Sequence, residues 1–310
     1  MPNRAICLPG IVQYSRSRPF SAIMVDTMPD LELVSKGQCF PRFRYEPRIA
    51  SSAFRESSKP VVPDRSPSSS PTTCQTSTSS SSASASPDGS TRRTGGIFDE
   101  VETELAPVDN ITDAALATFR AHYQDHAITK DAIFDYVYGV LHAPEYRHRF
   151  ASDLAKDLPR VPMAPDFHAF AKAGHALGKL HLSYETCEEY PLRVEFPEGG
   201  EATPEQYRLG TRKMRLIDDG GTLVVNEHVR LAGIPSEAHE YEVNGRAPLG
   251  WFIDRYHVKT DRRSGIVNDP NGWFDDPRDV VTAIRRIVHL SERTVAIVKS
   301  LPDPLAGLDG

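Results

Sequence analysis

A candidate catalytic motif is "NDPNGW", at residues 268 to 273. A methyl-transfer site for the exocyclic amine of a flipped-out base needs Asn, Asp or Ser, then two prolines and an aromatic residue. The first side chain and two proline-fixed carbonyls then hold the amine. Here Asn271 stands in place of the second proline, and a glycine is inserted before Trp273. Asp269 and Pro270 alone do not make that site, and the pattern is equally typical of a proline-led turn.

Other catalytic patterns are incomplete. A metal-dependent nuclease of the PD-(D/E)xK type needs a carboxylate two residues before its lysine, but Thr211 precedes Lys213 and His257 precedes Lys259. The glycines of "DDGGTLVV" come before a strand pattern, which favours a hairpin turn over a loop that cradles S-adenosylmethionine, and no Walker A loop occurs. The histidines show no His-Glu-x-x-His spacing. We therefore expect no catalytic residue, metal site or cofactor in this chain.

Basic residues gather in two stretches of the second half. The first stretch contains Arg208, Arg212, Lys213 and Arg215. The second contains Arg246, Arg255, Lys259, Arg262 and Arg263, with aromatic residues between them. Such side chains neutralise phosphates, and Arg, Asn or Gln can read base edges. We predict that both stretches bind DNA and that Asn268 and Asn271 are candidates for base reading.

The overall charge argues against a free-standing nucleic-acid binder. Residues 1–96 carry 12 basic and 7 acidic side chains, whereas residues 97–310 carry 24 basic and 35 acidic ones, a net charge of −11. A solvated charged face explains one basic cluster as well as DNA binding does. Two clusters within one strand-rich module of an acidic chain favour DNA binding.

The elements that must position these residues form two regions. Residues 97–183 show helical periodicity, which indicates a helical spacer. Residues 184–302 alternate like strands, with a hairpin turn at Asp218–Gly221, and close with a helix over Asp279–Ser300. The sequence thus predicts a mixed α/β (α+β) fold with a short tail at residues 303–310.

The first 96 residues have a different composition. Residues 51–90 contain 16 serines in 40 positions, and a segment so poor in large apolar groups cannot offset the entropy of ordering. We therefore expect a disordered Ser/Pro-rich leader over residues 1–96. No signal peptide, membrane span or disulfide framework is indicated, so a cytoplasmic setting is expected.

Several motifs resemble one known family in the right order. The helical region contains "IFDYVYGVLHAPEYRHRF", "LPRVPM" and "LHLSYE", and the strand-rich region contains "GTRKMR", "VVNEHVRLAGIP", "YEVNGRAPLGWFIDRYHVKTDRRSGIVNDPNGW" and "VHLSERTVAIVKSLP". From about residue 98 to 302, the chain resembles the C-terminal specificity (target recognition) domain of type I single-polypeptide (type ISP) restriction–modification enzymes and the segment that precedes it. In that family "SGIVNDPNGW" corresponds to a motif of the specificity domain, so the resemblance implies that "NDPNGW" is a turn.

The resemblance implies sequence-specific recognition of double-stranded DNA. The parent family also has a nuclease, an ATPase motor and an adenine-N6 methyltransferase, whose motifs have no counterpart here; S-adenosylmethionine, ATP and Mg are expected only for those domains. The gene is truncated, its start is misassigned, or the module works beside a separate methyltransferase or helicase–nuclease chain. Two alternatives stay open: a residual DNA methyltransferase with a degenerate motif, and a protein-interaction module that never touches DNA.

Overall fold

A computed structural model describes residues 3–8, 20–26, 38–47, 105–200 and 203–307. The chain divides into two units, residues 1–44 with 108–310 and residues 45–107. The second unit is described only at its two ends, which belong to a two-stranded sheet of β4 (Phe43–Pro47) and β5 (Leu105–Asp109).

Short strands occur where the sequence predicts a disordered leader. They are β1 (Ala5–Leu8), β2 (Ile23–Val25) and β3 (Gln38–Pro41), which form an antiparallel sheet in the order β2-β1-β3. The expectation of disorder is therefore wrong for residues 3–8, 20–26 and 38–47. The rest of the leader, with its serine runs, lies outside the described residues.

This N-terminal sheet is tied to the helical region by ion pairs. Arg4 donates to the buried carboxylate of Asp135 at 2.8 Å. The buried guanidinium of Arg42 lies 2.7 Å from Asp131 and also pairs with Asp109. Because buried charges need such partners, these contacts make the sheet an integral part of the fold.

The helical region follows its sequence signals closely. It contains α1 (Asp113–Tyr123), α2 (Lys130–Val140), α3 (Pro144–Arg149), α4 (Ala151–Leu154) and α5 (Phe167–Leu182). The side chains of Thr112, Thr129 and Asp166 cap α1, α2 and α5 by accepting from backbone N–H groups, as residues of these types do at helix starts. Pro144 opens α3, where its missing N–H costs nothing. The predicted helices of this region are confirmed.

Two glycines bring α2 and α5 into backbone contact. A Cβ atom on Gly174 would lie 1.7 Å from the carbonyl oxygen of Asp135, and one on Gly139 would lie 2.3 Å from that of Phe170. No side chain fits between the two helices at this crossing. The close approach lets Tyr136, Tyr138 and Phe170 fill the surrounding core.

The strand-rich region contains a four-stranded antiparallel sheet in the order β6-β9-β8-β7. Its strands are β6 (Arg193–Glu195), β7 (Arg215–Ile217), β8 (Thr222–Val224) and β9 (Arg230–Ala232). The predicted turn between β7 and β8 is present as η3 (Asp218–Gly220), with positive φ at Asp218, Asp219 and Gly220. Asp tolerates this left-handed backbone better than most residues, which is why "DDGG" makes a hairpin.

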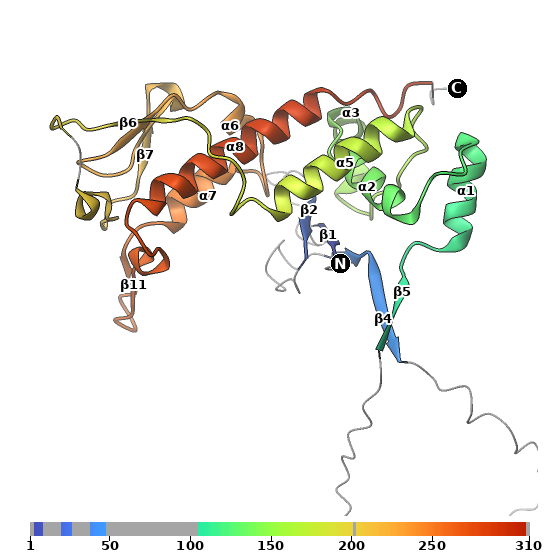
Figure 1. The fold of residues 1–310 in the computed structure, drawn as a ribbon, viewed down its shortest axis with the longest axis horizontal. Coiled ribbons are helices and arrows are strands. Elements are labelled where there is room, and N and C mark those ends of the chain that lie inside the picture. The colour runs from blue at the N-terminus through green and yellow to red at the C-terminus, as the bar shows by residue number, and fades with distance from the viewer. Residues whose placement is uncertain (1–2, 9–19, 27–37, 48–104, 201–202, 308–310) are drawn as a thin grey trace, which may run out of the picture. The chain divides into compact units, whose positions relative to one another are not determined.

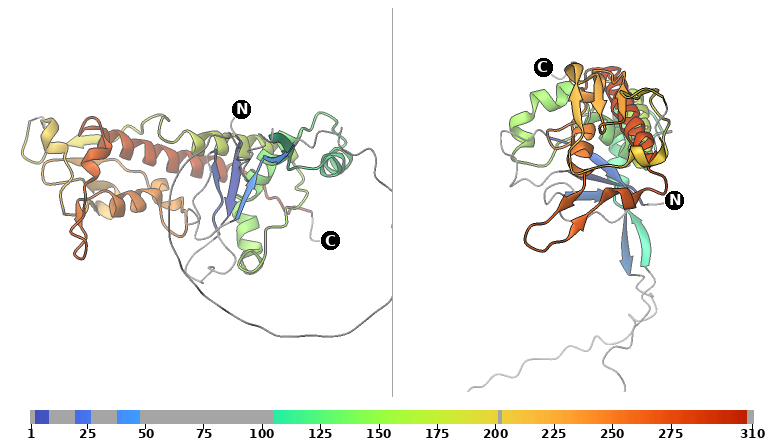
Figure 2. Two further views of the ribbon diagram at one scale, coloured as in Figure 1. Left: turned by 90° about the horizontal axis from the view of Figure 1, so that it is seen from below. Right: turned by 90° about the vertical axis from the view of Figure 1, so that its left-hand side faces the viewer.

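Shorter elements surround this sheet. They are η2 (Pro204–Tyr207), α6 (Glu237–Glu240), α7 (Pro248–Arg255), η4 (Pro270–Trp273) and a second antiparallel hairpin of β10 (Lys259–Thr260) and β11 (Val267–Asn268). Figures 1 and 2 show this second hairpin extending away from the sheet and from α7.

The last helix, α8 (Asp279–Lys299), joins the two regions, and its predicted position is confirmed. Its first half places Val280, Ile284 and Val288 in the core of the strand-rich region, while Ile297 and Val298 pack on the helical core. In Figure 1, α8 runs from α7 past α6 to α5, all of which it contacts. Within the described residues, no helix has the length and apolar character needed to span a bilayer.

Candidate nucleic-acid interface

The loop that carries the first basic stretch is held by two asparagine side chains. Asn271 accepts from the backbone N–H of Leu209 at 2.8 Å and donates to its carbonyl at 2.9 Å. Asn226 donates to the carbonyls of Gln206, at 2.8 Å, and of Arg208, at 3.1 Å. These bonds fix the backbone of the loop on which Arg208 and its basic neighbours stand.

The motif "NDPNGW" forms a capped turn. Asp269 precedes η4 and accepts from the backbone N–H of Asn271 at 2.9 Å, and the Asn271 amide donates to the same carboxylate at 2.7 Å. The predicted turn is confirmed. With its oxygen and nitrogen both engaged inside the protein, the Asn271 side chain anchors a loop and has no uncommitted donor for a base edge. Its partner Leu209 lies 62 positions away along the chain, so no local signal pointed to this role.

Asp254 brings together cations from three segments. Lys213 lies 2.7 Å from one carboxylate oxygen, and Arg246 donates to the other. Lys259 donates to the backbone carbonyl of the same aspartate at 3.2 Å. The hydrogen bond from Arg246 and then that from Lys213 lower the pKa of Asp254 to about 2, so the carboxylate is charged at neutral pH. Three of the predicted site residues thus meet at one acid, which we call the Asp254 cluster.

Aromatic side chains lie against Arg255, the last residue of α7, and against Arg246, which precedes α7 and also pairs with Asp254. The Arg255 guanidinium lies 5.7 Å from the ring centroid of Trp273, and that of Arg246 lies 5.5 Å from Trp251. Both tryptophans are 46% exposed. Such cation–π contacts hold the planar guanidinium groups in place at the surface without neutralising their charge.

The eleven candidate residues therefore differ in how much of their charge is available. Arg208 pairs with Glu205, and Lys213 and Arg246 pair with Asp254. Four exposed arginines have no hydrogen bond or ion pair from their side chains to any residue that the structure describes: Arg212, Arg215, Arg262 and Arg263. Asn268, in β11 opposite Lys259, likewise has no side-chain partner within that part of the chain.

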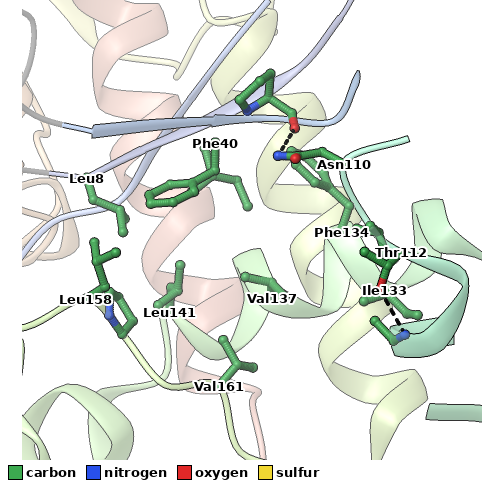
Figure 3. A pocket seen from close by; sticks show the side chains of 15 residues that line it. Leu8, Phe40, Asn110, Thr112, Ile133, Phe134, Val137, Leu141, Leu158 and Val161 are labelled. Carbon is green, nitrogen blue, oxygen red and sulfur yellow. Dashed lines mark hydrogen bonds between the residues drawn. The ribbon is translucent and has the colours of Figure 1, made fainter. Parts of the chain in front are cut away.

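A hollow of a different character lies in the helical region. It has a volume of about 380 Å³ and is lined by residues of β1, β3, α2 and the loop around Leu158. Figure 3 shows its mostly aliphatic walls, with Phe40 on one side and Val137 and Leu141 on the other. The polar groups at its rim are already used, because Asn110 donates to Pro41 and Thr112 caps α1. Among the described residues, no group of His, Cys, Asp and Glu is arranged to hold a metal ion.

The family model described as the Type ISP C-terminal specificity domain matches residues 1–283. The chain belongs to this family. The match includes the N-terminal strands of this specificity domain, which the resemblance visible in the sequence, from about residue 98 to 302, leaves out. The domain family is non-catalytic, and it places the chain among the parts of restriction–modification enzymes that carry specificity.

Solved structures similar to this specificity domain include two type ISP restriction–modification enzymes and a third protein, each in complex with DNA or a DNA substrate mimic. They are LlaBIII, an ATP-dependent Type ISP restriction–modification enzyme bound to DNA (26% identity, TM-score 0.67); a nuclease-deletion mutant of LlaGI with a DNA substrate mimic (27%, 0.64); and the DrdV–DNA complex determined by cryo-EM (26%, 0.68). Each match covers 97% of this chain but only 16%, 18% and 25% of the other chain, respectively. This chain therefore spans at most a quarter of their length. No curated protein matches it.

Proposed function

We propose that the strand-rich region binds duplex DNA in a sequence-specific manner and supplies target recognition to a restriction–modification system. The proposal rests on the bonds that hold the basic segments together. Asn271 ties the first basic loop to η4, and Asp254 ties the same loop to α7 and β10. These bonds bring together segments far apart in the sequence that carry Lys213, Arg246 and Lys259, and they support a common DNA-binding surface. The DNA in the three similar enzymes supports this reading.

The individual side chains take different parts in this proposal. Four arginines, Arg212, Arg215, Arg262 and Arg263, are free to bind phosphates, because no described carboxylate competes for them. Lys213 and Arg246 share the negative charge of Asp254, so they contribute less to DNA binding than two free cations would. Arg208 and Arg255 complete the proposed set of DNA-binding cations. Asn268 remains the candidate for reading a base edge, since its amide is uncommitted and can pair bidentately with adenine.

We further propose that the chemistry comes from outside the residues of this chain. The similar enzymes are four to six times longer, and a restriction–modification enzyme needs both methyl transfer and cleavage. An adenine-N6 methyltransferase and a nuclease, on a separate chain or on further parts of a longer one, would act at the target that this domain selects. The capped turn at Asp269 gives no support to a methyltransferase in this chain.

A matched pair of charge variants tests the DNA-binding proposal. Fluorescence anisotropy with duplex DNA at several salt concentrations compares the wild type with the triple variant Arg212→Ala, Arg262→Ala, Arg263→Ala. The control removes three exposed lysines of the helical region, Lys156→Ala, Lys172→Ala and Lys179→Ala. If three phosphate contacts are lost, the slope of log K against log salt should fall by about 3, and the affinity by at least tenfold at low salt. The control should bind like the wild type.

The hollow of the helical region favours a second candidate, a protein-interaction module. An open apolar hollow beside the 42%-exposed Leu158 can receive apolar side chains of a catalytic partner. This role is compatible with DNA binding by the other region. It becomes the sole function if the chain fails to bind duplex DNA, or if binding is insensitive to salt.

A further inference from the structure

The hairpin β10–β11 exposes aliphatic side chains at its outer end. Ile266 is 67% exposed and Val267 is 58% exposed, the two highest values among the large apolar residues that the structure describes. Figures 1 and 2 show the hairpin extending from the body of the strand-rich region. A monomer gains nothing from placing two β-branched aliphatic residues in water, so their position indicates a surface that covers them.

The turn of this hairpin is held rigidly although it is exposed. The Asp261 carboxylate accepts from the backbone N–H groups of Arg263, at 2.9 Å, and Ser264, at 2.7 Å, and from the Ser264 hydroxyl at 2.9 Å. The Asp261 N–H donates to the carbonyl of Ile266 at 2.9 Å, and Gly265 supplies the positive φ that closes the turn. The turn therefore presents Ile266 in a fixed place, which reduces the entropy lost on binding.

The charges around the turn favour a polyanion as the partner that covers Ile266 and Val267. Lys259, Arg262 and Arg263 flank the two aliphatic residues, and the side chains of both arginines have no partner among the described residues. The hairpin contains a single acid, Asp261, so its three cations leave residues 259–268 with a net charge of +2. A two-stranded ribbon also fits the width of a DNA groove, and Asn268 at its base offers an amide suited to a base edge.

We propose that Ile266, supported by Val267, is a wedge that inserts between base pairs of duplex DNA while Arg262 and Arg263 bind the phosphates beside it. This inference rests on the proposed function and deepens it by assigning a role to one residue. Apolar wedges of this kind unstack a base step and kink the duplex, so DNA deformability contributes to specificity along with base contacts.

The test uses the full chain and a duplex that it selects from a random-sequence pool, with 2-aminopurine placed at each position in turn. Insertion should raise the fluorescence of 2-aminopurine at one step, because unstacking relieves its quenching. Ile266→Ala should abolish that rise and weaken binding about tenfold, since the unstacked step loses its support. The slope of affinity against salt should stay as in the wild type, because no charge is removed. Val267→Ala should weaken binding to a smaller extent.

Control variants distinguish a failure of the wedge from a failure of DNA recognition. Leu158→Ala removes an exposed aliphatic side chain from the helical region and should change neither signal. If the chain selects and binds a duplex but Ile266→Ala retains full affinity and 2-aminopurine stays quenched at every position, the wedge is refuted while DNA recognition stands. If the chain selects no duplex, the proposed function falls together with the wedge. Ile266-dependent binding to vesicles of phosphatidylglycerol and phosphatidylcholine, with DNA unaffected, would assign the hairpin to a membrane surface instead.

Discussion

At the scale of single residues, the basic segments contain side chains whose charge is free and side chains that anchor the backbone. Asp254 and Asn271 hold the surface together, whereas Arg212, Arg262 and Arg263 leave their charge free. The basic clusters were visible in the sequence because most lysine and arginine side chains lie at the surface. These anchoring roles were not visible in the sequence, because Lys213 lies 41 positions from Asp254 and Leu209 lies 62 positions from Asn271.

The first prediction concerns Asp254. Asp254→Asn releases Lys213 and Arg246 from their shared acid, so binding to non-specific duplex DNA should strengthen several-fold, and the salt slope should steepen by about 1. Asp219→Asn, in the turn between β7 and β8, makes the same change of net charge away from the cluster and should leave the slope unchanged. Equal slopes for both variants would show that the cluster does not regulate the available charge.

The second prediction concerns Asn271. Asn271→Ala leaves the buried backbone N–H and carbonyl of Leu209 without partners, which should lower the free energy of unfolding by about 1–3 kcal/mol. Denaturant unfolding measures the loss, and hydrogen exchange at the Leu209 amide should quicken. Asn268→Ala is the control, because the Asn268 side chain has no partner in the described part of the chain. This variant should unfold like the wild type. An unchanged Leu209 exchange rate would mean that the bond does not anchor the loop.

At the scale of elements, helix starts and the "DDGG" hairpin followed from local chemistry, while the N-terminal strands did not. Thr129 and Pro144 act on backbone groups within the next turn, so their effect can be read from adjacent residues. Strands β1 and β3 pair across 30 to 36 positions, in a segment whose serine-rich continuation dominates the average composition. Whole-segment composition therefore predicted disorder at residues that in fact form a sheet.

The crossing of α2 and α5 gives the third prediction. Gly174→Ala places a methyl group against the backbone of Asp135, and rigid backbone cannot yield as a side chain can, so stability should fall by about 3 kcal/mol or more. Gly210→Ala is the control, because its added Cβ meets no atom within 4 Å. Thermal unfolding compares the two variants, and equal midpoints would contradict the close packing of these helices.

At the scale of the whole molecule, α8 couples two hydrophobic cores through one continuous helix. Its position followed from the sequence, but its apolar pattern alone did not show that one half serves each core. A polar link reinforces the coupling: the His181 ring lies 2.7 Å from the Tyr138 hydroxyl and 3.0 Å from that of Thr294, which joins α2, α5 and α8. A neutral imidazole can accept on one nitrogen and donate from the other, which suits both hydroxyls.

This link gives the fourth prediction, on pH. Burial, and then the nearby Arg147, lower the pKa of His181 from 6.5 to about 4. As the pH falls below 6.5, the unfolded chain binds a proton before the folded one does, so stability present at neutral pH is lost between pH 6.5 and 4. This histidine contributes a slope of up to about 1.4 kcal/mol per pH unit.

Urea unfolding of His181→Gln from pH 7 to 4.5 measures this contribution. The glutamine side chain keeps hydrogen-bonding capacity without titrating, so its stability should fall less steeply with acid than that of the wild type. His142, whose pKa is also lowered by burial, remains in both proteins and keeps some pH dependence in each. Parallel profiles for the two proteins would rule out His181 as the titrating group.

Hydrogen exchange of the full chain with and without its selected duplex tests most directly whether the strand-rich region binds DNA. DNA should protect three segments, residues 205–215, 259–268 and 269–273, and should leave α1, α2 and α5 unchanged. Protection confined to the helical region, or none in the β10–β11 hairpin and the loop anchored by Asn271, would contradict this prediction.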